Sequence, residues 1–206
     1  MFGSDLTLQL AGMRLLAGLI IAVVHGTTIA AAAVLLGDKG PRYDGRLTPL
    51  TFRHIDLVGL ASLVLSGFGW SRPVAIESTQ LRWGRWGLVV ATLAGSIALL
   101  ILAYALARLS IPLLQALPYT SGLAAAAFVR VASRLCVWLA LFALLPLPPL
   151  AGAHFLAALG IRLPPSAGVV LAWGLLLASL LGLVRIALTP AYDLIAPLML
   201  GADLAT

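Results

Sequence analysis

The stretch that decides the fold is VVHGTTIAAAAVLLGD, residues 23–38, an apolar segment with one histidine, His25, near its middle. It lies within an apolar run over residues 15–36. At about 1.5 Å per residue, a run of this length crosses the ~30 Å hydrocarbon core of a bilayer. An ionisable side chain at mid-membrane is costly, so His25 needs a structural or a functional reason to be there.

The composition of the whole chain indicates a membrane protein. Of its 206 residues, 62% are hydrophobic and only 10% are charged, and the mean hydropathy is +1.08. Soluble domains usually carry about a quarter charged residues. The period-two alternation of a membrane β-barrel is absent from the sequence. The sequence therefore predicts an all-α polytopic integral membrane protein.

The apolar segments predict a single membrane domain with about four full spans and one or two re-entrant pieces. One segment, residues 54–69, reaches only ~24 Å as a helix, which is short for a crossing. It lies between two basic loops, and a crossing would place these on opposite sides of the membrane, so a re-entrant hairpin is favoured over a span. A short apolar piece at 150–160 follows PLPPLAG, which cannot continue a helix. The four full spans are expected at residues 15–36, 86–108, 122–145 and 166–189.

The net charge of +6 indicates membrane orientation rather than nucleic-acid binding. In so apolar a chain, basic residues are expected in cytoplasmic loops. We therefore expect a prokaryotic cytoplasmic (inner) membrane location, with lipids and other integral membrane proteins as partners and no nucleic acid. The residues expected on the cytoplasmic side are Lys39, Arg42, Arg46, Arg53, Arg72, Arg82, Arg85 and Arg162.

Five sequence features, in this order, resemble one known family. They are the spacing of His25 to Gly37-Asp38, then GRLTPLTFRHIDLVG (45–59), GFGWSRPV (67–74), ATLAGSIALL (91–100) and LLPLPPLAG (144–152). Together they resemble the site-2 protease family of intramembrane zinc metalloproteases, in particular its compact prokaryotic branch. The resemblance covers most of residues 20–160 and implies that family's helical membrane core.

The same resemblance implies that catalysis has been lost. Active members carry H-E-x-x-H on a membrane helix, where two histidines bind zinc and the glutamate is the general base; an aspartate in a later N-x-x-P-x-P-P-x-D-G-like motif is the third ligand. Here His25 matches the first histidine. The glutamate, the second histidine, the asparagine and the aspartate correspond to Gly26, Ile29, Ala143 and Ala151. This pattern predicts a pseudoprotease with no catalytic residues and no cofactor.

The remaining histidines leave two interpretations open. His25 is either a remnant that is hydrogen-bonded inside the bundle or a surviving ligand for another metal or cofactor. His154 follows Ala151 by one helical turn and is a weak candidate for a two-histidine site with His25. His54 and Asp56 belong to the HID stretch and are expected to hold the hairpin backbone.

The charged residues and the small residues supply candidate contacts with lipids and partners. Asp38 and Asp44 lie in a mixed-charge loop, either solvated or at a metal or lipid site, and Arg42 and Arg46 are expected to meet anionic headgroups. Arg130 and Arg134 form an i, i+4 pair that either snorkels to the interface or meets an acid, a lipid phosphate or a polar groove. The small-residue faces at 30–34, with Ala31 and Ala32, and at 122–127 permit close packing with another helix.

The leading functional hypothesis is a non-catalytic accessory or assembly subunit of a larger membrane complex. It rests partly on elimination, because the catalytic set is lost and the sequence carries no soluble domain. Two alternatives remain open. One is an intramembrane zinc metalloprotease with atypical ligands. The other is a lipid- or small-molecule-binding membrane protein that uses the former substrate groove.

Overall fold

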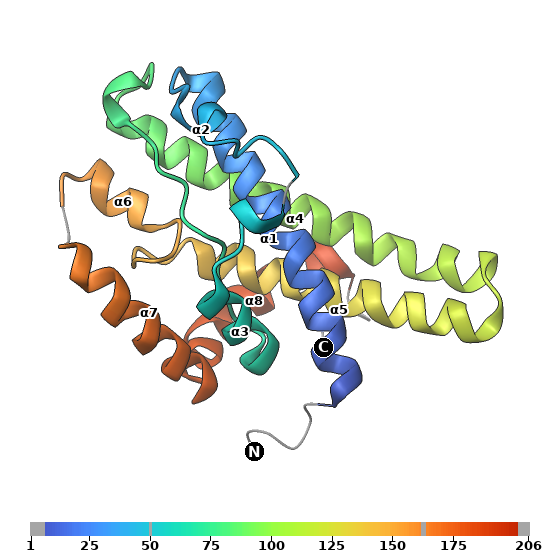
Figure 1. Cartoon of the computed structure of the whole chain (residues 1–206). Coiled ribbons are helices and arrows are strands. Elements are labelled where there is room, and N and C mark those ends of the chain that lie inside the picture. The colour runs from blue at the N-terminus through green and yellow to red at the C-terminus, as the bar shows by residue number, and fades with distance from the viewer. Residues whose placement is uncertain (1–6, 50, 162–163, 202–206) are drawn as a thin grey trace.

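The computed structural model describes residues 7–49, 51–161 and 164–201, and within these ranges the chain is helical (Figure 1). The prediction of an all-α membrane protein is confirmed. Four helices, α1, α4, α5 and α8, are long and apolar enough to cross a membrane, which supports an integral membrane protein. The elements are α1 (Leu8–Leu36), α2 (Gly40–Tyr43), η1 (Thr51–Arg53), α3 (Leu57–Ser66), η2 (Ser78–Gln80), α4 (Arg85–Ala116), α5 (Tyr119–Ala143), α6 (Ala153–Ala158), α7 (Pro165–Leu180) and α8 (Leu183–Leu200).

Helix α5 forms the centre of the hydrophobic core. It packs antiparallel to α4 along a long hairpin, and α1 and α8 pack against this pair (Figure 1). An aromatic cluster holds α5 to the segment after α3: the Phe68 ring lies 5.3 Å from Trp138 and 5.7 Å from Phe142, both in edge-to-face geometry. Such aromatic pairs stabilise beyond their buried area, so the segment after α3 is fixed firmly against α5.

The predicted span at 166–189 is wrong, because the chain breaks inside it. Helix α7 ends at Leu180, and Gly182, with φ +76°, starts α8. Only glycine adopts this left-handed backbone readily, so it can end one helix and redirect the chain into the next. The residues that follow the predicted span continue α8 into the core, where Tyr192, Ala196 and Leu200 are buried.

The other predicted segments lie close to helices of the structure but differ in length. Helix α4 runs on to Ala116 through Pro112, so the loop expected at 109–121 shrinks to the junction with α5. The segment at 54–69 is a ten-residue helix that ends at Gly67 and then returns as extended chain, with a bridge from Ser71 to Ile55. Whether this helix-and-return shape dips into the bilayer stays a prediction.

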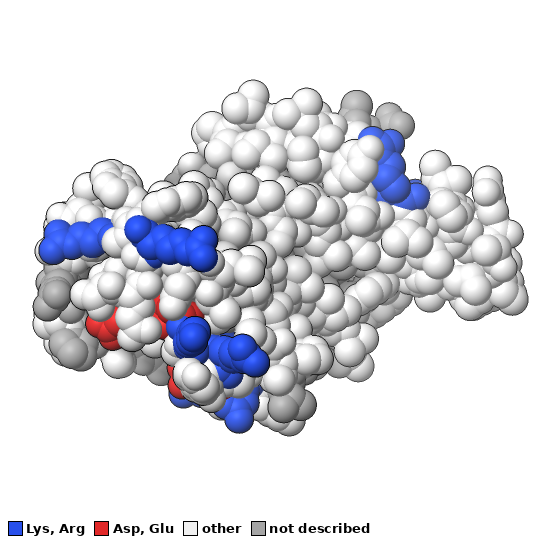
Figure 2. Space-filling view, turned by 90° about the horizontal axis from the view of Figure 1, so that it is seen from above, with Lys and Arg blue, Asp and Glu red and all other residues white. Residues whose placement is uncertain are grey.

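Basic residues gather where α1 ends and α4 begins. Figure 2 shows this end of the molecule with most of the visible lysines and arginines and a few acidic residues beside them. The cytoplasmic orientation of this end stays a prediction. The exposed members of this basic surface are Lys39, Arg42, Arg53, Arg72, Arg82 and Arg85.

Candidate functional site

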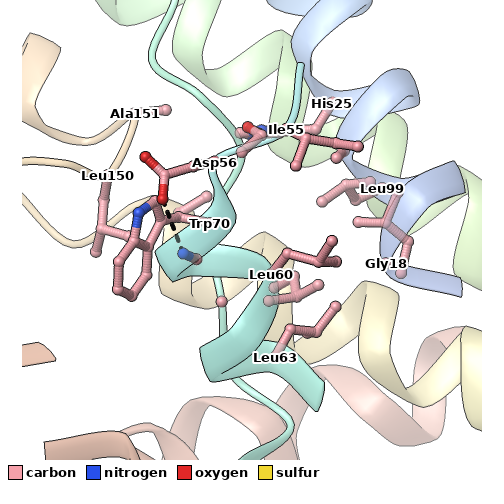
Figure 3. Close-up of a pocket in the computed structure, with 17 residues that line it drawn as sticks. Gly18, His25, Ile55, Asp56, Leu60, Leu63, Trp70, Leu99, Leu150 and Ala151 are labelled. Atoms are coloured by element: carbon pink, nitrogen blue, oxygen red, sulfur yellow. Dashed lines mark hydrogen bonds between the residues drawn. The ribbon is translucent and has the colours of Figure 1, made fainter. Parts of the chain in front are cut away.

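One small cavity brings together residues that are far apart in the sequence (Figure 3). His25 of α1, Ala143 at the end of α5 and Ala151 before α6 all line it, together with Asp56, Trp70 and Ser71. Three of the positions matched to the protease motifs therefore meet at one place. The cavity volume is about 40 Å³, enough for a few water molecules at most.

His25 is buried and makes one hydrogen bond to a residue that the sequence did not single out. Its Nδ1 lies 3.0 Å from the Ser71 hydroxyl, within the GFGWSRPV stretch. Its Nε2 is buried and has no hydrogen-bond partner among the described residues. The structure thus agrees with a histidine hydrogen-bonded inside the bundle, and it leaves one ring nitrogen open.

Gly26, at the position that matches the glutamate of the family motif, is in contact with a second buried histidine. A Cβ atom on Gly26 would lie 2.4 Å from Nδ1 of His54, well inside van der Waals contact. His54 is 0% exposed, and its Nε2 donates a hydrogen bond to the Thr48 carbonyl oxygen at 3.1 Å. The His54 ring therefore occupies the space that a side chain at position 26 would need.

The environment of His54 favours its neutral form. Burial holds the pKa of His54 below its ordinary value, although the hydrogen bond to Thr48 opposes the shift; the nearby Arg46 cation lowers the pKa further. Because Nε2 carries the donated proton, Nδ1 of the neutral ring bears the lone pair, and this buried nitrogen has no partner among the described residues. The imidazole faces Gly26, and the Thr48 carbonyl orients it from the other side.

The positions of the second and third zinc ligands form one apolar contact region. Ile29 is 2% exposed and belongs to a hydrophobic cluster with Ala30, Val74 and Ala91, and Ala151 packs against this cluster. Gly95 of α4 permits the packing, because a Cβ there would lie 2.6 Å from Cγ1 of Ile29. Where the resemblance implies metal ligands, the structure has close hydrocarbon contacts.

His154 lies near His25 but its ring is already engaged. Its Nδ1 is 2.9 Å from the Thr92 hydroxyl, and its ring also hydrogen-bonds the Val74 backbone. Burial lowers the pKa of His154, and the bond to Val74 opposes the shift. His154 is thus near His25, with its Nδ1 engaged by the Thr92 hydroxyl.

The residues at this site do not fit a catalytic zinc ion. Such an ion takes three protein ligands and keeps a fourth position for water. Within the part of the chain that the structure describes, no three His, Cys, Asp or Glu side chains gather in a way that could hold a metal. Among the described residues that line the cavity, His25 is the one with an open imidazole nitrogen, Nε2.

Asp38 is buried, which excludes the solvated alternative for this residue. It is 1% exposed; its Oδ1 accepts a hydrogen bond from the Gly40 amide at 2.8 Å, and its Oδ2 accepts one from the Glu77 amide at 2.7 Å. The carboxylate thus ties the end of α1 to the loop before η2. Asp44, in contrast, is exposed as expected. Asp56 also has a backbone role, because it caps α3 through the Gly59 amide at 2.8 Å.

The candidate contact arginines differ in their surroundings. Arg46 is partly buried, and its guanidinium donates to the backbone carbonyls of Arg53 and Pro73. It therefore connects the loop after α2 with the segments before and after α3. Arg42 and Arg130 are exposed, and Arg134 is exposed beside a second cavity. Contacts of these side chains with lipid or with a partner stay predictions.

The alanine face at 30–34 packs mainly within the chain. Ala30 and Ala33 are 0% exposed, whereas Ala31 and Ala32 are half-buried. At the other small-residue face, Gly122 lets the α4–α5 hairpin close tightly, because a Cβ there would lie 3.2 Å from the Leu113 carbonyl oxygen. These small residues serve close packing inside the molecule, and the partner contact expected at Ala31 and Ala32 stays a prediction.

Comparison with known proteins gives one informative similarity. The chain is 32% identical over 135 residues to the Putative zinc metalloprotease YwhC of Bacillus subtilis (strain 168). The match covers 63% of this chain and 60% of that protein. No protein-family model and no solved structure match the chain. The similarity supports a metalloprotease-like relationship.

Proposed function

We propose that this protein is a catalytically degenerate member of the site-2 protease family that acts by binding rather than by proteolysis. The observation that carries the proposal is the contact of Gly26 with the buried His54 ring. A glutamate at position 26 has no room without displacing that ring. The general base of the family's mechanism is therefore not merely substituted, because its space is filled.

The apolar packing beside Gly26 supports the same conclusion. Hydrolysis of a peptide bond by a metalloprotease requires a metal-activated water and a group that accepts its proton. Ile29 and Ala151 offer no donor atoms, and the hydrophobic cluster that contains Ile29 packs against Ala151. A water beside His25 would have no metal-ligand set around it among the described residues, and the Asp56 carboxylate that lines the same cavity accepts the α3 capping hydrogen bond from the Gly59 amide.

We assign the protein an accessory or assembly role in a larger membrane complex of the prokaryotic cytoplasmic membrane. The α4–α5 hairpin supports this role, because its far end extends beyond the other helices (Figure 1). Helix α4 has 32 residues and is about 48 Å long, which exceeds the ~30 Å hydrocarbon core. Apolar side chains are exposed towards this end, namely Tyr104, Ile111, Leu114, Leu117, Tyr119 and Leu123.

The two alternatives have less support. A metalloprotease with atypical ligands would need several ligands around Nε2 of His25, and within the described residues no three His, Cys, Asp or Glu side chains gather to hold a metal. A lipid-binding protein that uses the former groove would need space beside His25, where the cavity measures only about 40 Å³. An acyl chain does not fit in that volume.

Purification from native membranes in mild detergent tests the binding role. We expect a partner polypeptide in fixed stoichiometry. The double variant Tyr119→Ala/Leu123→Ala should lose it, because both side chains lie exposed at the hairpin end. The control Leu194→Ala, also highly exposed but on α8, should keep it. A monomer without a partner would contradict the role, as would a cleaved partner that becomes intact in His25→Ala.

A further inference from the structure

A second cavity lies between α1, α5 and α8 and shares no lining residue with the cavity beside His25. Its volume is about 250 Å³, far above what a single water needs. Each of the three helices contributes one arginine: Arg14, Arg134 and Arg185. The other described lining residues carry no charge: Leu10, Gly67, Val131, Leu135, Trp138 and Tyr192.

Two of these arginines converge on Gly67, directly after α3. A Cβ built on Gly67 would lie 3.8 Å from Nη2 of Arg14 and 3.8 Å from Nη2 of Arg185. The two nitrogens are therefore no more than twice that distance apart. Gly67 has φ +86°, where a side chain is disfavoured, so the space between the guanidinium groups stays open. Like charges this close repel one another, and an anion between them removes the repulsion.

Both guanidinium groups are held in place before any ligand arrives. Nη1 of Arg14 donates to the carbonyl oxygens of Val64 at 3.0 Å and Leu65 at 3.3 Å. These carbonyls belong to the last turn of α3, where the helix dipole is negative. Cζ of Arg185 lies 5.4 Å from the Trp138 ring centroid and 5.8 Å from that of Phe68, so cation–π contacts fix its orientation.

The cavity lies at the end of α1 opposite the basic loops. Arg14 precedes Leu36 by 22 positions, which is about 33 Å along a helix. That distance matches the thickness of the hydrocarbon core, so Arg14 reaches the level of the other leaflet's headgroups when α1 spans the bilayer.

We infer that this cavity binds a phosphate group with net negative charge. Guanidinium groups match phosphate oxygens with paired, charge-assisted hydrogen bonds. Two sources carry this chemistry: the headgroup of an anionic phospholipid and free inorganic phosphate. The aliphatic lining residues Leu10, Val131 and Leu135 offer contacts for the glycerol and acyl atoms of a lipid. This inference does not depend on whether the chain is catalytic.

Native mass spectrometry and thermal unfolding of the delipidated full chain in mild detergent test the inference. The probes are phosphatidylglycerol, zwitterionic phosphatidylcholine and inorganic phosphate. Arg185→Gln should weaken phosphatidylglycerol binding about tenfold, the loss expected for one charge-assisted hydrogen bond. Arg134→Gln, a substitution at an exposed position, should also weaken phosphatidylglycerol binding. It replaces Arg185→Gln as the test if that variant does not fold. Arg108→Gln, whose exposed guanidinium lies over Tyr104 on α4, is the matched control and should bind like the unaltered protein.

The outcomes separate the two sources. Stable retention of phosphatidylglycerol that inorganic phosphate does not displace supports a lipid headgroup site. Displacement by inorganic phosphate supports a site for the free anion. Equal retention of phosphatidylglycerol and phosphatidylcholine, no binding of either anionic probe, or equal weakening in Arg108→Gln would overturn the inference.

Discussion

The two cavities differ in their volume and in the charge of the residues that line them. The cavity beside His25 has a volume of about 40 Å³, and the neighbouring positions that match the family's glutamate and zinc ligands are in contact with His54 and with an apolar cluster. The cavity between α1, α5 and α8 holds about 250 Å³ and carries three arginines. The region that resembles a protease is packed, whereas the room and the charge to bind a ligand lie elsewhere.

The largest effect is expected beside the His25 cavity, where Gly26 and the His54 ring are in closest contact. Gly26→Glu should destabilise the protein by about 3 kcal/mol or more, because it combines overpacking with a buried carboxylate. Thermal unfolding in detergent measures the loss. Gly12→Ala is the matched control: Gly12 also lies on α1, but nothing comes within 4 Å of a Cβ there, so this change should be neutral or slightly stabilising.

A double-mutant cycle shows whether His54 is what fills the space at position 26. Gly26→Ala should cost less stability in a His54→Ala background than in the unaltered chain, because the clashing ring is gone. Additive costs would mean that His54 does not occupy the position of the lost base.

Helix packing beside Ile29 offers the next largest effect. Gly95→Ala places a methyl group 2.6 Å from Cγ1 of Ile29, and we expect a loss of about 1–3 kcal/mol in the free energy of unfolding. Gly174→Ala on α7, where a Cβ meets nothing within 4 Å, should cost nothing. If the two substitutions change the stability by the same amount in thermal unfolding, α1 and α4 do not pack closely at Gly95.

The second cavity should tolerate added volume. Val131→Leu adds one methylene to a residue that lines about 250 Å³ of space, so stability should change by no more than about 0.5 kcal/mol. Thermal unfolding of Val131→Leu and of Gly95→Ala, measured together, compares the second cavity with the packed region around Ile29. A loss as large as that of Gly95→Ala would remove the contrast between them.

The smallest expected effect is a pH dependence from His54. Its pKa is lowered in the folded state, mainly by burial, so the folded protein binds fewer protons than the unfolded chain. The stabilising contribution is complete above the ordinary histidine pKa of about 6.5 and is lost as the pH falls below it. The melting temperature should drop between pH 7.5 and pH 5.5, and less so in His54→Gln. An unchanged drop in that variant would assign the effect to other groups.

The sequence predicted the membrane fold, because the apolar runs are long enough to be read from hydropathy, and the structure then brings His25, Ala143 and Ala151 to one cavity. It missed the break at Gly182, since residues 166–189 are uniformly apolar and a left-handed glycine leaves no mark in hydropathy. It also missed the burial of Asp38 and the contact of His54 with Gly26, which depend on distant loops. Arg14 and Arg185 carried a readable signal, a cation inside an apolar run.

Zinc stoichiometry tests the central claim most directly. The purified chain is exposed to zinc, dialysed and analysed for metal, alongside His25→Ala and the double variant Ile29→His/Ala151→Asp. We predict no stoichiometric zinc in the unaltered chain and a gain of zinc in the double variant, which returns two ligand types beside His25. One zinc per unaltered chain, lost in His25→Ala, would contradict the claim that this centre is degenerate.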